Sequence, residues 1–259
     1  MSSHQHIAVI TGASSGLGAL FAEELSRQSD IAELWLIARR EERLLELKKR
    51  IESSTRVRLR VFAVDLLQGM SVLRAAFLEE APEVRYWINN AGLGVAGRFE
   101  RLSDWARTQV VEVNCRALVE MDAVVLPYLV PGARVLHTAS AAAFLPQPGF
   151  SVYAASKAFV LSYSRALGAE LRERGISVTA VCPGPMETDF FRYSQEGSVR
   201  GIKKIGLEDP KKVVKKALRQ ARRGRSIAIS SWSVWGLRLI SRILPHPFVL
   251  WLEKKMRVF

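Results

Sequence analysis

The sequence has few of the features that mark secreted, metal-binding or membrane-spanning proteins. Only two of its 259 residues are cysteines, Cys115 and Cys182, too few for a disulfide framework or a four-ligand zinc site, which favours a reducing, cytoplasmic compartment. We find no metal-ligand constellation, and the first residues lack the basic segment of a secretory signal. No apolar run approaches the ~18 residues of a membrane span. With 49% apolar and 24% charged residues, the composition is globular.

Acidic residues are scarce in the last quarter of the chain. Residues 1–198 hold 22 Lys and Arg against 22 Asp and Glu, whereas residues 199–259 hold 16 basic and 3 acidic residues. The formal charge of +13 therefore belongs to the tail. The tail contains no recognisable nucleic-acid module, so we expect no nucleic-acid partner. A basic tail on a neutral body indicates a local role toward an anionic surface or an anionic substrate.

Short apolar runs alternate with longer amphipathic segments up to residue 182. The apolar runs predict strands at residues 7–10, 34–37, 57–64, 84–88, 135–137 and 178–181. The amphipathic segments predict helices at residues 17–28, 41–53, 71–80, 103–126 and 151–174. Apolar strands separated by helices indicate a parallel sheet covered on both faces. The sequence therefore predicts an α/β fold, a doubly wound Rossmann fold with a mainly parallel sheet.

A glycine-rich turn, TGASSGLG, follows the first predicted strand at residues 11–18. Glycine lets the backbone turn sharply and approach a pyrophosphate, which then lies at the positive N-terminal end of the next helix. A tight strand-to-helix turn without a ligand is the alternative. We predict that the turn contacts a dinucleotide through Thr11, Gly12, Ser14, Ser15, Gly16, Leu17 and Gly18.

The second predicted strand ends on two arginines rather than on an acidic residue. In a dinucleotide site, an acidic side chain at this position accepts the ribose 2′-hydroxyl, whereas arginine pairs with a 2′-phosphate. Arg39 and Arg40 lie about 21 residues past Gly18. We therefore predict NADP(H) as the cofactor, with Arg39 as the main contact and Arg40 as a helper. The alternative for Arg40 is an ordinary helix start paired with Glu41 and Glu42.

Tyr153 and Lys157 are four residues apart in a predicted helix, a spacing that places them on one helix face. A phenol with a pKa of ~10 exchanges protons poorly at neutral pH. A nearby ammonium stabilises the phenolate and lowers that pKa. Ser140, at the end of the fifth predicted strand, can donate a hydrogen bond to a substrate oxygen. We predict substrate contacts at Ser140 and Tyr153; a surface tyrosine and lysine without this role is the alternative.

These residues resemble the signature of the short-chain dehydrogenase/reductase family. The resemblance covers residues 7–188, about 70% of the chain. The features that carry it are, in chain order, the turn at 11–18, Asp65, the segment NNAG at 89–92, Asn114, Ser140, Tyr153 with Lys157, and PGPMET at 183–188.

The resemblance implies a role for each matched residue. Tyr153 would exchange a proton with the substrate oxygen, and Lys157 would lower its pKa and hold the nicotinamide ribose. Ser140 would orient the carbonyl, and Asn114 would keep a water in the proton relay. The remaining matched residues would contact the cofactor: Asp65 and Asn90 on the adenosine side, and Pro183, Gly184 and Thr188 beside the nicotinamide and diphosphate. Family members often form dimers or tetramers through the helices predicted at 103–126 and 151–174.

The resemblance and the residues together predict an NADP(H)-dependent oxidoreductase that interconverts a ketone and a secondary alcohol. Phe144, Phe150, Phe190 and Phe191 lie near the predicted site and suit a lipophilic substrate, although packing alone also explains aromatic residues there. A hydroxysteroid, a bile-acid-like alcohol and a 3-oxoacyl thioester all fit. The alternative is a non-catalytic dinucleotide-binding or membrane-associated scaffold, which would not need to keep the four matched catalytic residues.

The last predicted helix, at about 232–244, is basic and amphipathic. Its apolar arc consists of Trp232, Trp235, Leu237, Leu239, Ile240, Ile243 and Leu244, with Val234 outside it. We expect this arc to pack on the body, the lid or a second subunit; peripheral contact with an anionic membrane is the alternative. We therefore assign residues 1–206 to the catalytic, NADP-binding domain, with a substrate lid at about 189–206. Residues 207–259 form a basic helical extension packed on or near it.

Overall fold

The chain folds around one parallel sheet. The structure, a computed structural model, describes residues 6–186 and 207–255. Seven strands lie in the order β3-β2-β1-β4-β5-β6-β7, and every pair of neighbours is parallel. The direction of winding reverses beside β1, as in doubly wound folds. The predicted fold class is therefore confirmed.

The strands and helices match the predicted segments closely. The strands are β1 (His6–Thr11), β2 (Ile31–Ala38), β3 (Arg58–Ala63), β4 (Val84–Asn89), β5 (Leu129–Thr138), β6 (Ser177–Val181) and β7 (Ile227–Ala228). The helices are α1 (Gly16–Leu25), α2 (Glu41–Glu52), α3 (Met70–Glu80), α4 (Asp104–Val111), α5 (Ala117–Val125), α6 (Ser151–Glu170), α7 (Pro210–Arg222), α8 (Trp232–Ile243) and α9 (His246–Lys255). The helix predicted over 103–126 is interrupted by a π-helical turn, Glu112–Arg116.

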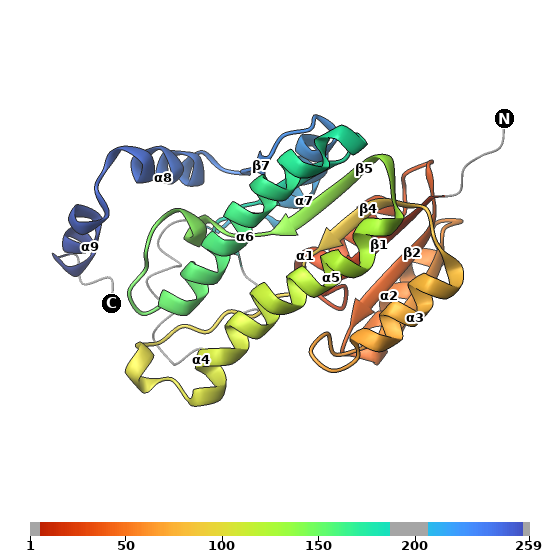
Figure 1. Cartoon of the computed structure of the whole chain (residues 1–259), viewed down its shortest axis with the longest axis horizontal. Coiled ribbons are helices and arrows are strands. Elements are labelled where there is room, and N and C mark those ends of the chain that lie inside the picture. Colours follow the sequence, from red (N-terminus) through yellow and green to blue (C-terminus); the bar gives the residue numbers. More distant parts are fainter. Residues whose placement is uncertain (1–5, 187–206, 256–259) are drawn as a thin grey trace.

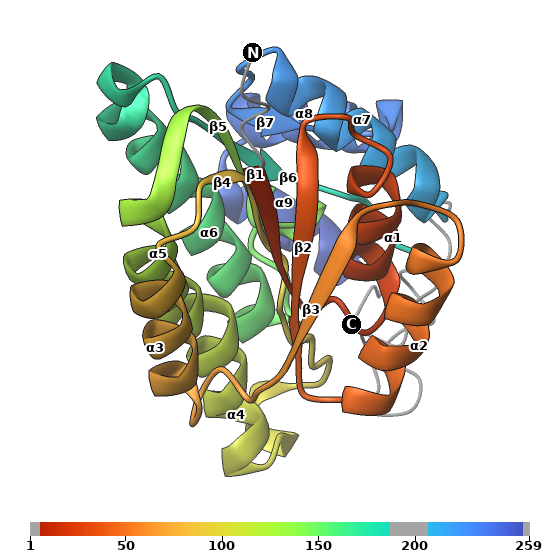
Figure 2. The same cartoon turned by 90° about the vertical axis from the view of Figure 1, so that its right-hand side faces the viewer.

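Helices cover both faces of the sheet, as Figure 2 shows. α1, α2 and α7 pack on one face, and α3, α5 and α6 pack on the other. Side chains alternate along each strand, so in β1 Ala8 and Ile10 belong to the first layer of core and Ile7 and Val9 to the second. Both faces of a parallel strand are thus buried, which explains why the strands read as continuous apolar runs.

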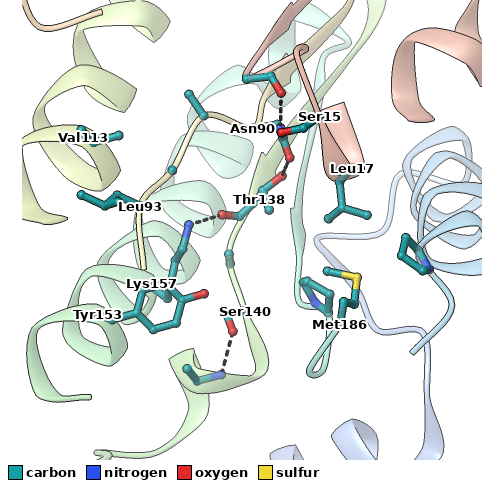
Figure 3. Close-up of a pocket in the computed structure, with 18 of the residues that line it drawn as sticks. Ser15, Leu17, Asn90, Leu93, Val113, Thr138, Ser140, Tyr153, Lys157 and Met186 are labelled. Atoms are coloured by element: carbon teal, nitrogen blue, oxygen red, sulfur yellow. Dashed lines mark hydrogen bonds between the residues drawn. The ribbon is translucent and has the colours of Figure 1, made fainter. Parts of the chain in front are cut away.

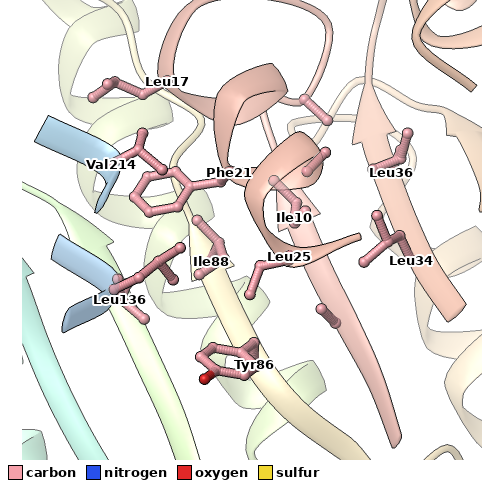
Figure 4. Close-up of a cluster of buried hydrophobic side chains, with 14 of the residues drawn as sticks. Ile10, Leu17, Phe21, Leu25, Leu34, Leu36, Tyr86, Ile88, Leu136 and Val214 are labelled. Carbon is pink, nitrogen blue, oxygen red and sulfur yellow. The ribbon is translucent and has the colours of Figure 1, made fainter. Parts of the chain in front are cut away.

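The first core layer holds α7 against the strands. Figure 4 shows Phe21 of α1 and Val214 of α7 beside Ile10, Ile88 and Leu136 of the central strands. β7 extends the same sheet, because it pairs with β6. Thus α7 and β7, at the start of the basic extension, are integral to the sheet and its core.

Beyond β7 the chain leaves this body. α8 and α9 form an arm at one end of the molecule, outside the helical layers (Figure 1). We refer to these two helices, residues 232–255, as the arm. None of the helices within the described residues is long and apolar enough to cross a bilayer.

Candidate active site

A cavity of about 1390 Å³ opens where the strands end. Its wall includes residues that follow β1, β2, β4, β5 and β6, namely Gly12, Arg39, Asn90, Ser140 and Pro183. The carboxyl edge of a doubly wound sheet, beside the reversal of strand order, is where such folds bind ligands. The cavity therefore brings together motifs that are far apart in the sequence.

The glycine turn lines one end of the cavity, which we call its narrow end. Gly12 has a φ of +65°, which favours glycine, and a Cβ there would lie 2.9 Å from Asn90 Nδ2. A Cβ on Gly18 would collide with the carbonyl oxygen of Gly12. Ser15, Gly16 and the start of α1 face the cavity, so the helix presents its unpaired N–H groups there. This cradle fits the pyrophosphate of a dinucleotide.

Thr11 shapes the turn from behind rather than from inside the cavity. Its Oγ1 accepts hydrogen bonds from the backbone N–H of Asn90 at 2.9 Å and of Ala91 at 3.0 Å. Thr138 donates to Asn90 Oδ1 at 3.0 Å, which ties the ends of β1, β4 and β5 together. Asn90 lines the cavity, whereas Thr11 and Gly18 are buried and do not. Thr11 and Gly18, for which the sequence predicts direct contacts with the cofactor, thus form the turn and do not line the cavity.

Two arginines lie at the end of β2, as the sequence predicts, but in different surroundings. The Arg40 guanidinium donates to the hydroxyls of Ser14, at 3.1 Å, and Ser15, at 2.8 Å. Arg39 is more exposed, and its guanidinium lies 3.9 Å from the Asp65 carboxylate. All five side chains line the cavity. Arg40 is at the N-cap of α2, as in the alternative for this residue, and its hydrogen bonds also place its charge beside the glycine turn.

Ser140, Tyr153 and Lys157 meet in the middle of the cavity (Figure 3). Ser140 caps a 3-10 turn after β5, where its Oγ accepts from the Ala142 N–H at 3.1 Å, and its side chain lies beside Tyr153 in the cavity. Lys157 Nζ lies 5.8 Å from the centre of the Tyr153 ring and donates to the Thr138 carbonyl at 2.7 Å. The predicted set is therefore assembled from β5 and one face of α6.

Burial dominates the electrostatics of this pair. It raises the pKa of Tyr153 to about 12, although the hydrogen bond with Ser140 opposes the shift. It also lowers the pKa of Lys157 to about 8. The sequence-based expectation that Lys157 brings the pKa of Tyr153 below its usual value does not hold in this state, because the loss of hydration on burial dominates the shift. At neutral pH the phenol keeps its proton.

Asn114 lies behind the cavity wall, in the π-helical turn between α4 and α5. Its Nδ2 donates to the Leu93 carbonyl and to Ser156 Oγ, both at 2.9 Å, and its Oδ1 accepts from the Leu93 N–H at 2.8 Å. These three hydrogen bonds use both the amide nitrogen and the amide oxygen of Asn114, and they form where the helix widens into the π-helical turn. The water-holding role that the resemblance implies for Asn114 stays a prediction.

Comparison with known proteins identifies the family. A family model described as short chain dehydrogenase matches residues 6–198. The chain belongs to the short-chain dehydrogenase/reductase family. Members of this oxidoreductase family bind a nicotinamide dinucleotide, which the cradle at Gly12 and Gly16 fits.

Two relatives and one solved structure illustrate the similarity. This short-chain dehydrogenase is 38% identical to sulfoacetaldehyde reductase 2 of Chromohalobacter salexigens over 195 residues, covering 71% of this chain and 74% of that protein. It is 31% identical to 17-beta-hydroxysteroid dehydrogenase type 3 of Danio rerio over 213 residues, covering 74% and 67% respectively. A short-chain dehydrogenase of Sphingobium yanoikuyae in complex with NADPH superposes with a TM-score of 0.78 at 27% identity, covering 92% of this chain and 93% of that one.

The other end of the cavity, which we call its wide end, is mostly apolar and includes residues that the sequence did not single out as site residues. These are Leu93, Trp105, Gln109, Val113, Gln147, Val234, Leu237 and Ile240. Phe150 also lines it, as expected. Gln109 in α4 and Val113 in the π-helical turn are four residues apart within the single helix predicted at 103–126, and this spacing could have marked them as neighbours. Val234 gave no such signal, because it lies outside the apolar arc of its helix.

Pro183 and Gly184 close the cavity on the side of the arm. A Cβ on Gly184 would lie 3.0 Å from Val234 Cγ2 of α8 and 2.8 Å from a Glu208 carboxylate oxygen, so glycine permits the close approach of the arm. Thr188, the lid predicted at 189–206, and Phe190 and Phe191 lie outside the described residues. Within the described residues, no cluster of His, Cys, Asp and Glu side chains could hold a metal ion.

Proposed function

We propose that this short-chain dehydrogenase uses NADP(H) to interconvert a lipophilic ketone and its secondary alcohol. The observation that carries the proposal is that the Ser140 and Tyr153 side chains lie together inside the same cavity as the glycine turn, with Lys157 one helical turn away. A scaffold protein would not need two hydroxyls and a buried ammonium at the centre of a dinucleotide cavity.

The chain's own residues supply orientation and the proton. Ser140 and Tyr153 converge on one point, where both can donate to a carbonyl oxygen. The protonated phenol is ready to donate its proton as negative charge develops on that oxygen. The Lys157 ammonium stabilises the phenolate left behind, and the apolar wall keeps bulk water from competing. A bound nicotinamide supplies the hydride.

The charges at the narrow end favour the phosphorylated cofactor. Arg39, Arg40 and Arg50 all line the cavity there, and Asp65 is the carboxylate near Arg39. Guanidinium groups pair bidentately with phosphate, and β2 ends without an acidic residue to accept a 2′-hydroxyl. The NADPH bound in the similar Sphingobium yanoikuyae structure supports the same choice. Arg39 remains our main 2′-phosphate contact, with Arg40 beside it.

The lining of the wide end favours a lipophilic substrate over an anionic one. Of the described residues around the cavity, the cationic ones are Arg39, Arg40 and Arg50 at the narrow end and Lys157 at the centre. A small sulfonate would therefore find no further cation among them, whereas Trp105, Phe150 and the aliphatic residues can cover a ring system or a long acyl chain. The 17-beta-hydroxysteroid dehydrogenase relative supports this class.

Replacement of one hydroxyl tests the proposal. We expect Tyr153→Phe to lower kcat for reduction of a cyclic ketone by about 10²-fold or more, with NADPH affinity nearly unchanged. Tyr128→Phe is the matched control, because Tyr128 packs on Phe77 away from the cavity. NADPH absorbance, followed with ketosteroids, bile-acid ketones, 3-oxoacyl thioesters and sulfoacetaldehyde, reports both activity and substrate class. Full activity of Tyr153→Phe, or turnover confined to sulfoacetaldehyde, would contradict the proposal.

Cofactor choice needs its own measurement. The ratio of kcat/KM with NADPH to that with NADH should fall at least tenfold in Arg39→Asp, equivalent to about 1.4 kcal/mol, and by less in Arg40→Asp. Arg43→Asp, one helical turn further along α2, is the control. An unchanged ratio in Arg39→Asp would exclude it as the main 2′-phosphate contact.

We also propose that two or four copies associate through α4, α5 and α6. Their outer surfaces expose Trp105, Val111, Val119 and Phe159, and Phe99 is exposed just before α4; large apolar side chains that gather on one surface are typical of an interface. Light scattering should give the mass of a dimer or tetramer. A monomer at micromolar concentration would contradict this.

A further inference from the structure

The arm exposes the apolar side of α8 and buries the other side. Trp232 is 89% exposed and Ile243 is 69% exposed, and Trp235, Leu239 and Ile240 are about half exposed. On the opposite side of the helix Val234 is 2% exposed and packs with Leu237 against the body. Most of the arc that we expected to pack on protein thus faces outward, whereas its member Leu237 faces the body. This orientation is the reverse of that of an ordinary surface helix.

The same character continues into α9. Phe248 and Trp251 are about half exposed and stack with their ring centres 5.8 Å apart, while Val249 is buried. Lys255 Nζ lies 5.2 Å from the centre of the Trp251 ring. Exposed tryptophans with a basic residue beside them are typical of helices at a membrane interface.

Cationic side chains accompany this apolar surface. Arg242 lies next to the exposed arc of α8, and Arg238 is one turn before it. α7 adds exposed Lys and Arg residues, namely Lys211, Lys212, Lys215, Arg219 and Arg222. Between β6 and α8, the two carboxylates of the described residues have partners within the fold: Glu208 accepts from Ser230, and Asp209 caps α7. Of the α7 cations, Lys215 lies 3.8 Å from the Glu24 carboxylate. The C-terminal part of the structure therefore presents a net positive charge.

This charge favours a membrane over a second copy of the chain as the occupant. A two-fold contact through α8 would bring Arg238 and Arg242 of both copies together, and the chain as a whole carries +13. An anionic bilayer instead pairs with these cations, at about 1 kcal/mol for each basic residue near the surface. With 12 and 10 residues, α8 and α9 are too short to span a bilayer and suit binding in its surface plane.

The apolar side of α8 also adjoins the wide end of the cavity. Ile240 is half exposed on the outer surface and lines the cavity, as do Val234 and Leu237 on the inner side of the same helix. A lipophilic molecule could therefore pass from an acyl layer along α8 into the cavity without crossing bulk water.

We propose that the arm binds the boundary between headgroups and acyl chains of an anionic bilayer and turns the wide end of the active-site cavity toward it. The binding itself does not depend on the proposed function, whereas delivery of a substrate from the lipid does. The acyl boundary takes up Trp232, Trp235 and Ile243, and the anionic headgroups pair with Arg242 and Lys255.

Vesicle flotation with the full chain tests the proposal. Vesicles of phosphatidylcholine with phosphatidylserine should carry the protein upward at low salt, and the bound fraction should fall as salt rises. The combined variant Trp232→Ser, Trp235→Ser and Ile243→Ser should bind the vesicles more weakly than the wild type by a factor of about ten or more. Val72→Ser with Leu78→Ser is the matched control, because both residues are exposed and apolar but lie on α3; it should bind as the wild type does.

Turnover of a water-soluble ketone by the same proteins separates the two proposals. None of the three arm substitutions falls on a residue that lines the cavity, so this turnover should be unchanged in the arm variant. An inactive wild type that still floats would contradict the proposed function and leave the membrane proposal supported. No flotation of the wild type, or equal flotation of wild type and arm variant, would overturn the membrane proposal. Loss of a soluble dimer in the arm variant without vesicle binding would assign the surface to a second copy and overturn it as well.

Discussion

α7 and α8 follow one another in the chain, and both are amphipathic and basic, yet they face the body with opposite sides. α7 buries Val213, Val214 and Leu218 and exposes its lysines and arginines. α8 buries Val234 and exposes both of its tryptophans. An amphipathic pattern therefore predicts that a helix has two different sides, but the space left by the rest of the fold decides which side is covered.

The largest effect expected from this comparison is at the buried side of α7. Leu218→Ala should lower the free energy of unfolding by about 2–5 kcal/mol, because it leaves a cavity in the core between α7 and α1. Arg219→Ala, the adjacent exposed residue, should change it by less than about 0.5 kcal/mol. Urea unfolding measures both, and similar values for the two variants would contradict the assigned faces of α7.

Lys157 in α6 is the reverse of the case in α8. α8 exposes apolar side chains to solvent, whereas Lys157 is a charged group buried in the body. Burial lowers its pKa to about 8 from an ordinary value of 10.5, so the cost of the ammonium is fully present below pH 8 and disappears as the pH rises toward 10.5. Lys157→Met should therefore raise the free energy of unfolding by about 1–3 kcal/mol at pH 7, less at pH 10, and abolish turnover. Urea unfolding at the two pH values checks the sign. A destabilised variant at pH 7 would show that the ammonium is well solvated.

We expect a smaller change in unfolding free energy at Val234, which is the buried residue of α8. Val234→Ala removes two methyl groups from the contact with Gly184 and should cost about 1–2 kcal/mol of unfolding free energy. The KM for a lipophilic ketone should rise, since Val234 also lines the cavity. Steady-state kinetics with Leu239→Ala as the control would show whether this is specific to the inner side of α8.

The smallest effect is expected on the outer side of α8. Trp235→Ser should change the free energy of unfolding in solution by no more than about 0.5 kcal/mol, because the side chain is half exposed. The midpoint of urea unfolding is a sufficient measurement. A loss of several kcal/mol would mean that this side is covered by protein and would remove the contrast with α7.

Most of the fold and the positions of the central site residues could be predicted from the sequence. The apolar runs marked six of the strands, and the four-residue spacing placed Tyr153 and Lys157 on one face of α6. The sequence did not predict the π-helical turn. Asn114 in this turn forms hydrogen bonds with Leu93 and Ser156, which lie far from it in the sequence. The pKa of Tyr153 was expected to move downward, and the structure raises it, because a pairwise view of two side chains omits the burial that the whole fold imposes.

The alternation of strands and helices, the glycine turn and the tyrosine-lysine pair can all be read from the chain without its fold. Each depends on short-range stereochemistry: the period of a strand or helix, the positive φ of Gly12, and the rise of one helical turn. Three other features come from the packing of distant segments: the depth at which Tyr153 and Lys157 are buried, the place of Thr11 behind the turn, and the outward direction of the tryptophans of α8. These features depend on which surfaces distant segments leave open, and no local pattern contains that information.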